Sequence, residues 1–116
     1  MSTLTITEFL EARIAEDEED VAPLVARYEN DRGGWAIYYG ERVRKECAAK
    51  RAVIELYEIH RENRDARRSP RAREAEDERA AQDRRTQEAR TRVAEDALRA
   101  LAAAYKDHPD YREEWA

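Results

Sequence analysis

The chain has 116 residues and a formal net charge of −5, and 21 of its apolar residues are alanines. Leu, Ile, Val and Phe together number only 17, about 15% of the chain, which is below the roughly 20% expected of a chain with a conventional globular core. Ala, Glu, Lys, Leu and Arg account for 67 residues, a composition typical of long helices, so we expect an all-α protein.

The first predicted element is an acidic helix over residues 5–30. Thr5 and Glu8 stand at the spacing of a capping box, in which each side chain accepts a hydrogen bond from the backbone N–H of the other residue. Pro23 interrupts the helical pattern, because a proline inside a helix removes one backbone hydrogen bond and clashes with the preceding turn. We therefore expect a kink near Pro23, or two short helices that meet near Asp20. The apolar residues that recur at helical spacing are Leu10, Ile14, Val21 and Tyr28.

A turn and a second helix follow. Residues 30–34 combine Asn, Asp, Arg and two glycines, which is the clearest turn signal in the chain. We expect the aromatic-rich segment 35–39 to form a hydrophobic turn that plugs the core, since the chain offers no second strand for it to pair with. Residues 41–67 then predict a helix whose apolar face is wide enough to be buried on two sides.

The third predicted helix spans residues 70–105. Ser69 and Pro70 supply an N-cap and a proline at the first helical position. The first half of this helix has no large apolar side chain, so we expect it to be solvent-exposed and held by ion pairs between residues four apart. An apolar stripe resumes at Val93, and Asp107 is expected to cap a short C-terminal helical turn.

Together these elements predict one helical domain over residues 1–116, in which a bent N-terminal helix packs on a long antiparallel helical hairpin. The single cysteine, Cys47, excludes an internal disulfide and fits a reducing compartment. The sequence has no apolar stretch of membrane-spanning length and no leader-like N-terminus. We therefore expect a soluble, cytoplasmic protein without a membrane partner.

Two groups of polar residues are candidates for chemistry. The acidic run of residues 16–20 could contact a basic partner, imitate a phosphate backbone or collect a divalent cation, but a solvated face is the simpler interpretation. His108 has several carboxylates nearby in the sequence and could belong to a metal site or an acid–base pair. Capping explains these residues more simply, and His60 lacks a partner, so we expect no catalytic residue, no metal and no cofactor. The carboxylates of the acidic run are Glu16, Asp17, Glu18, Glu19 and Asp20.

Three blocks of the sequence resemble a known family. They are residues 8–18 (EFLEARIAEDE), residues 49–54 (AKRAVI) and residues 105–115 (YKDHPDYREEW), of which the last is the most specific. The family consists of small, uncharacterised helical proteins from actinobacteria and their phages and is catalogued as a domain of unknown function. The resemblance implies a phage or host accessory protein and carries over no activity and no catalytic residue.

The function that these observations favour is a protein-interaction or oligomerisation module. We expect a homodimer that buries Ile54, Tyr57 and Leu98, because so short a chain often needs a second subunit to complete its core. Two alternatives remain open. One is an acidic protein that imitates nucleic acid in an anti-defence or regulatory role, and the other is a metal-dependent enzyme that uses His108. Nucleic acid is not an expected partner, because acids are interleaved with the bases of residues 61–92.

The C-terminal aromatic residues are predicted to dock on the first helix. Trp115 lies where fraying would be normal, and Tyr111 stands one helical turn before it. We expect both rings to pack near Phe9 or Leu10, and the alternative is a tail that binds a partner. The candidate interaction residues are therefore the five carboxylates of the acidic run together with Tyr57, His108, Tyr111 and Trp115.

Overall fold

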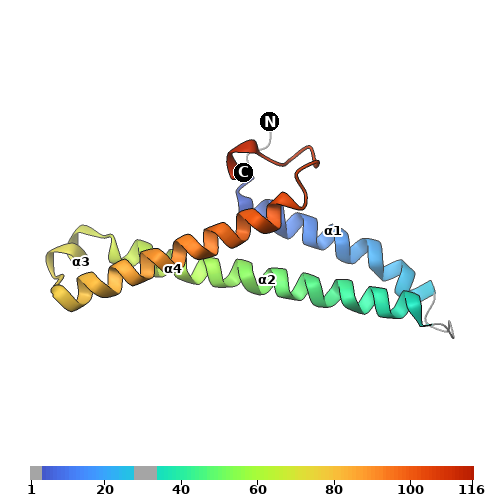
Figure 1. Cartoon of the computed structure of the whole chain (residues 1–116), viewed down its shortest axis with the longest axis horizontal. Coiled ribbons are helices and arrows are strands. Elements are labelled where there is room, and N and C mark those ends of the chain that lie inside the picture. The colour runs from blue at the N-terminus through green and yellow to red at the C-terminus, as the bar shows by residue number, and fades with distance from the viewer. Residues whose placement is uncertain (1–3, 28–33) are drawn as a thin grey trace.

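The computed structural model describes residues 4–27 and 34–116, and the regular elements in these ranges are all helical. They are α1 (Ile6–Arg27), α2 (Trp35–Arg67), α3 (Pro70–Glu74), α4 (Glu78–Ala103) and a single 3-10 turn, η1 (Glu113–Trp115). The all-α prediction is confirmed. α2 and α4 form a long antiparallel hairpin, and α1 packs along α2 (Figure 1). Within the described ranges, no helix is both long enough and apolar enough to cross a membrane.

α1 begins with the predicted capping box. The Thr5 hydroxyl accepts the backbone N–H of Glu8 at 3.2 Å, and the Glu8 carboxylate accepts that of Thr5 at 3.1 Å. The helix then continues through Pro23 to its end, so the prediction of two short helices meeting near Asp20 is wrong. Pro23 removes only one backbone hydrogen bond of the helix, and α1 continues four residues beyond it. Residues 28–30 of the predicted helix lie outside the described residues.

α2 begins earlier than the sequence predicts. Residues 35–40 form its first turns, and Tyr38 is 66% exposed. The prediction of a turn is therefore wrong, and Tyr38 and Tyr39 do not plug the core; the side chains of residues 35–37 lie outside the described part of the chain. Gly34, the N-cap, adopts a left-handed φ of 64°, which turns the chain sharply enough for the aromatic segment to enter the helix directly. The turn predicted just before Gly34 lies outside the described residues.

The predicted third helix is interrupted. α3 starts as expected, with the Ser69 hydroxyl accepting the backbone N–H of Ala72 at 3.2 Å, but it ends after five residues. α4 begins after a short break, where the Asp77 carboxylate accepts the backbone N–H of Ala80 at 2.8 Å. A single helix over residues 70–105 is therefore wrong. Because no large apolar side chain holds this stretch in line, a strong N-cap residue starts a new helix.

The apolar core lies where α1, the middle of α2 and the C-terminal half of α4 meet. Ile54 and Leu98, expected at a dimer interface, are only 4% and 1% exposed within a single chain. That part of the dimer prediction is wrong, because these two side chains have almost no surface left to offer a second copy. The buried residues of the core are Phe9, Leu10, Ile14, Cys47, Ile54, Leu98, Ala102 and Trp115.

The C-terminal segment folds back over the beginning of α1 (Figure 1). The Trp115 ring centroid lies 5.0 Å from that of Phe9, and the Tyr111 centroid lies 6.0 Å from it. Trp115 is 8% exposed. The predicted docking of both rings on the first helix is confirmed, and it closes one end of the core.

The molecule as a whole is elongated, with extents of 64 × 33 × 18 Å. Its radius of gyration is 19.1 Å, against about 13 Å for a compact domain of this length. It exposes 8489 Å², whereas a compact monomer of 13.6 kDa exposes about 6600 Å². The chain therefore presents a surplus of roughly 1900 Å² to its surroundings.

Candidate interaction surface

An open groove of about 430 Å³ runs between α2 and α4. Two large apolar side chains at the groove are unusually exposed, Leu56 at 51% and Val93 at 70%. Neighbouring exposed apolar side chains of this size are typical of a binding surface. The residues that line the groove are Val53, Leu56 and His60 from α2 and Thr86, Ala89, Arg90, Val93, Ala94 and Ala97 from α4.

The groove belongs to a wider face, which we call the groove face. On α2 it consists of Ala49, Ala52, Val53, Leu56, Ile59, His60 and Asn63, which recur at helical spacing. On α4 it consists of Thr86, Ala89, Val93, Ala97 and Ala100. Residues 49–63 and 86–100 each cover about 21 Å at 1.5 Å per residue. The chain has 42% charged residues, and on this part of α4 the charged side chains that flank the stripe are Arg90, which lines the groove, and Asp96, three residues after Val93.

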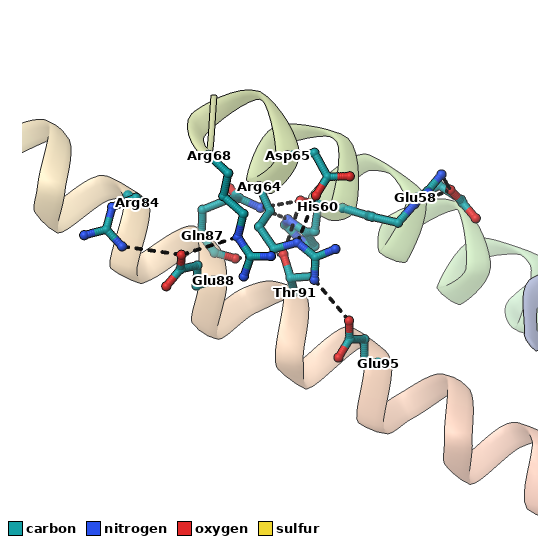
Figure 2. Close-up of polar contacts among 11 residues, drawn as sticks. Glu58, His60, Arg64, Asp65, Arg68, Arg84, Gln87, Glu88, Thr91 and Glu95 are labelled. Atoms are coloured by element: carbon teal, nitrogen blue, oxygen red, sulfur yellow. Dashed lines mark hydrogen bonds and ion pairs between the residues drawn. The ribbon is translucent and has the colours of Figure 1, made fainter. Parts of the chain in front are cut away.

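A buried polar seam joins α2 to α4 beside the groove (Figure 2). Gln87 Nε2 lies 2.8 Å from His60 Nδ1 and donates to the His60 carbonyl at 3.3 Å. The Thr91 hydroxyl lies 3.2 Å from the same carbonyl, and both Gln87 and Thr91 are buried. Because polar groups buried between helices need partners, this seam fixes the register of the hairpin where large apolar residues are scarce.

Ion pairs hold the same end of the hairpin together (Figure 2). Arg64 lies 3.2 Å from Glu95 across the two helices. Arg84 lies 2.7 Å from Glu76 and 3.4 Å from Glu88, the second of which is a pair predicted from the spacing of four. By helical spacing, Glu88 and Glu95 lie on the side of α4 opposite the groove face. These two carboxylates of α4 therefore lie away from the groove.

The acidic run is largely engaged within the chain. Glu19 and Asp20 are exposed, and the hydrogen bond from Arg51 lowers the pKa of Glu18. The structure therefore uses Asp17 and Glu18 to attach α1 to the segment after α4 and to α2, and pairs Glu16 within α1, rather than presenting the run as a continuous acidic surface. The three carboxylates held by other side chains are Glu16 by Arg13, Asp17 by Tyr105 and Glu18 by Arg51.

A hydrogen-bonded chain beside the core links α1, α2 and the segment after α4. The Lys50 ammonium donates to the Tyr105 hydroxyl at 2.9 Å, and that hydroxyl donates to Asp17 at 2.7 Å. Burial raises the pKa of Tyr105, and the hydrogen bond to Asp17 acts in the same direction. Burial also raises the pKa of the neighbouring Cys47 thiol, which disfavours the reactive thiolate. These contacts serve to hold the three segments together.

His108 is part of the packed C-terminal segment. Its ring lies 5.8 Å from the Phe9 ring, and its Nδ1 accepts the backbone N–H of Asp110 at 3.0 Å. Asp107 lies within consecutive turns over residues 104–110, so the prediction that it caps a helical turn is wrong, since His108 supplies the local hydrogen bond. In residues 4–27 and 34–116, no three His, Cys, Asp or Glu side chains lie close enough together to hold a metal ion.

The remaining predicted interaction residues also make contacts inside the chain. Tyr111 packs edge-on against Trp115 with centroids 5.6 Å apart. Tyr57 is half-buried against the core, and this burial raises its pKa. Of the residues selected from the sequence, the structure therefore brings the three aromatic ones to the core and leaves Glu19 and Asp20 exposed.

Sequence reasoning missed the groove face and the polar seam. Leu56 and Val93 were recognisable as apolar, but periodicity does not say which of two apolar faces of α2 is covered by α1. The seam gave no apolar signal at all, because Gln87 and Thr91 are polar residues inside a charged stretch. The usable signal for the groove face was the absence of charge at helical spacing on both arms of the hairpin.

The chain belongs to DUF6221, a family of unknown function, whose model matches residues 3–116. The resemblance to a domain of unknown function is confirmed by this match. No curated protein and no solved structure matches the chain. The geometry described above is therefore the basis for a functional proposal.

Proposed function

We propose that this protein is an interaction module that binds through the groove face of α2 and α4. The observation that carries the proposal is the exposure of Leu56 and Val93, 51% and 70%, on a largely uncharged face of a highly charged chain. Exposed apolar surface is costly in water, and covering it is favourable by roughly 25 cal/mol per Å². The surplus surface of the elongated chain supports the same conclusion.

The shape of the groove suits an apolar helical surface. Two antiparallel helices leave a furrow between them, and a further helix packs into such a furrow when its side chains recur at helical spacing. Ala89 and Ala97 are small and flank the larger Val93, so the groove face alternates gaps and protrusions along α4. Alternation of this kind permits interdigitation with another helix.

The proposed role is non-enzymatic and cytoplasmic. The resemblance to actinobacterial and actinophage proteins supports an accessory role in a host cell or its phage. An acidic imitation of nucleic acid is less well supported, because Glu16, Asp17 and Glu18 are already held by other side chains of the same chain. A metal-dependent enzyme is also less well supported, because His108 packs against Phe9 and uses Nδ1 in a local hydrogen bond.

A charged substitution on the groove face tests the proposal. We expect Val93→Arg to abolish association of the purified chain, both with itself by light scattering and with any protein that the tagged chain captures from a lysate. Ala15→Arg is the matched control, because Ala15 is exposed on α1 and receives the same side chain. The proposal is refuted if both variants associate as the unmodified chain does, or if the unmodified chain associates with nothing.

A further inference from the structure

We infer that the groove face is covered by a second copy of this chain, with α2 of one copy packed antiparallel on α4 of the other. This inference rests on the proposed function and adds the identity and orientation of the partner. Charged residues at the two outer edges of the groove face carry the argument, together with the levels at which they lie along the hairpin.

The outer edges of the groove face differ in net charge: the α2 edge carries two glutamates, whereas the α4 edge carries two arginines with one exposed carboxylate, Asp96, between them. Glu55 and Glu62 lie seven residues apart beside the α2 stripe, and Arg92 and Arg99 lie seven residues apart beside the α4 stripe. All four are exposed. Among the residues that the structure describes, none of the four has an ion-pair partner, although many other charged side chains of the chain do. A spacing of seven keeps each pair on one edge of its helix.

The register of the hairpin places these charges at matching heights. The hydrogen bonds from Lys50 to Tyr105 and from Thr91 to the His60 carbonyl show which residues of α2 and α4 lie level with one another. Glu55 falls near the level of Arg99 and Glu62 near that of Arg92, because helices in an antiparallel pair advance equally in opposite directions. Within one copy these residues are on opposite outer edges of the hairpin, too far apart to pair.

A two-fold axis parallel to the helices brings these edges together. Such an axis places α2 of each copy against α4 of the other. It leaves the position of every residue along the helix axis unchanged. Glu55 then meets Arg99 of the second copy, and Glu62 meets Arg92 of the second copy. The two-fold symmetry repeats both contacts, so the interface gains ion pairs on both outer edges.

The other face-to-face arrangement is opposed by the same charges. A two-fold axis that crosses the helices at right angles would lay α2 on α2 and α4 on α4. Glu55 and Glu62 would then face glutamates of the second copy, and Arg92 and Arg99 would face arginines. Like charges placed opposite one another across an interface suppress that pairing.

Side-chain size agrees with the first arrangement. At the same heights, Leu56 of one copy faces Ala97 of the other, and Val53 faces Ala100, so large side chains of α2 meet small ones of α4. The whole elongated chain exposes roughly 1900 Å² more than a compact monomer, and each partner in a standard interface buries about 800 Å². A dimer of this kind is therefore within reach of the exposed surface.

Charge reversal in the full-length chain tests the arrangement, with helicity checked by circular dichroism. We expect a dimer by sedimentation equilibrium at micromolar concentration. Glu55→Arg with Glu62→Arg, or Arg92→Glu with Arg99→Glu, should each raise the dimer dissociation constant at least about tenfold, because several exposed pairs turn from attraction to repulsion. A mixture of the two double variants should form a heterodimer of near-normal affinity by native mass spectrometry, since all of its edge pairs are attractive again. Glu19→Arg with Glu74→Arg is the control of equal charge change at exposed residues outside the groove face.

The outcomes separate this inference from the proposed function. A monomer at all concentrations, or double variants that fail to form a heterodimer, overturns the inference of a second copy in this orientation. The proposed function then stands or falls on Val93→Arg, because loss of a captured protein on that substitution still assigns binding to the groove face. A dimer that tolerates Val93→Arg overturns the inference, since the interface must lie elsewhere, and it overturns the proposed function as well if capture of other proteins is also unchanged.

Discussion

Truncation of Trp115 should remove a large share of the stability of this small core. The Trp115 ring is 8% exposed and lies against Phe9 and Tyr111, with ring centroids 5.0 and 5.6 Å away. A tryptophan buries about 150–250 Å², which at roughly 25 cal/mol per Å² corresponds to about 4–6 kcal/mol. Substitutions of buried Phe or Trp by Ala cost about 3–5 kcal/mol, so we expect a loss in that range for Trp115→Ala.

Urea denaturation followed by circular dichroism at 222 nm measures this loss. A domain of this size has about 6–17 kcal/mol of total stability, so the variant should unfold at a clearly lower urea concentration and melt roughly 10–20 °C lower. Tyr38→Ala is the control, because Tyr38 is 66% exposed and should change the free energy of unfolding by less than about 0.5 kcal/mol. A loss below about 1 kcal/mol for Trp115→Ala would show that the C-terminal segment is not part of the folded core.

Three further substitutions test the interior. Gln87→Ala should lower the free energy of unfolding by about 1–3 kcal/mol, because it removes two hydrogen bonds, one to His60 Nδ1 and one to the His60 carbonyl, which then keeps only Thr91 as a side-chain donor; exposed Gln82→Ala should cost far less. Because the pKa of Tyr105 is raised in the folded state, its contribution to stability is complete below about pH 10 and is lost as the pH rises through the folded-state pKa. In urea titrations at a series of pH values, Tyr105→Phe should therefore make the free energy of unfolding fall less steeply at alkaline pH. Arg13→Met should leave the melting temperature unchanged or raise it. Arg13 is 6% exposed, and two of its side-chain nitrogens have no hydrogen-bond partner among the described residues. A lower melting temperature would contradict this prediction.

The sequence predicted best where local chemistry alone determines the structure. The capping box at Thr5 and the N-cap at Ser69 depend on side chains that act within one turn, and both form as expected. The docking of Trp115 was predictable for a related reason, since a large aromatic residue at that position is otherwise unexplained. These features required no knowledge of how the helices are arranged in space.

The errors arose where two local signals competed. Pro23 is a helix breaker in general, but α1 continues through it to Arg27, so a proline alone does not determine where a helix ends. Residues 70–105 were predicted as one helix because possible ion pairs favour helix along the whole stretch. The structure instead starts a new helix at the Asp77 N-cap. Such helix boundaries depend on free-energy differences of about 1 kcal/mol between competing caps and breakers. The spacing of apolar residues does not show which of them is stronger.

The location of the groove face follows from how few large apolar residues the chain has to distribute. α1 spans 22 residues and covers only one side of the hairpin, whereas α2 spans 33 residues and extends well beyond it. Where α1 is absent, Gln87 and Thr91 replace apolar contacts between α2 and α4 with hydrogen bonds, which need little volume. Leu56 and Val93 are thereby left on the uncovered side, although each would be more stable in a core. A hairpin that is fixed by polar contacts and leaves these apolar residues outside supports the proposal that a partner completes the packing, and the edge charges are the basis for the orientation that we infer.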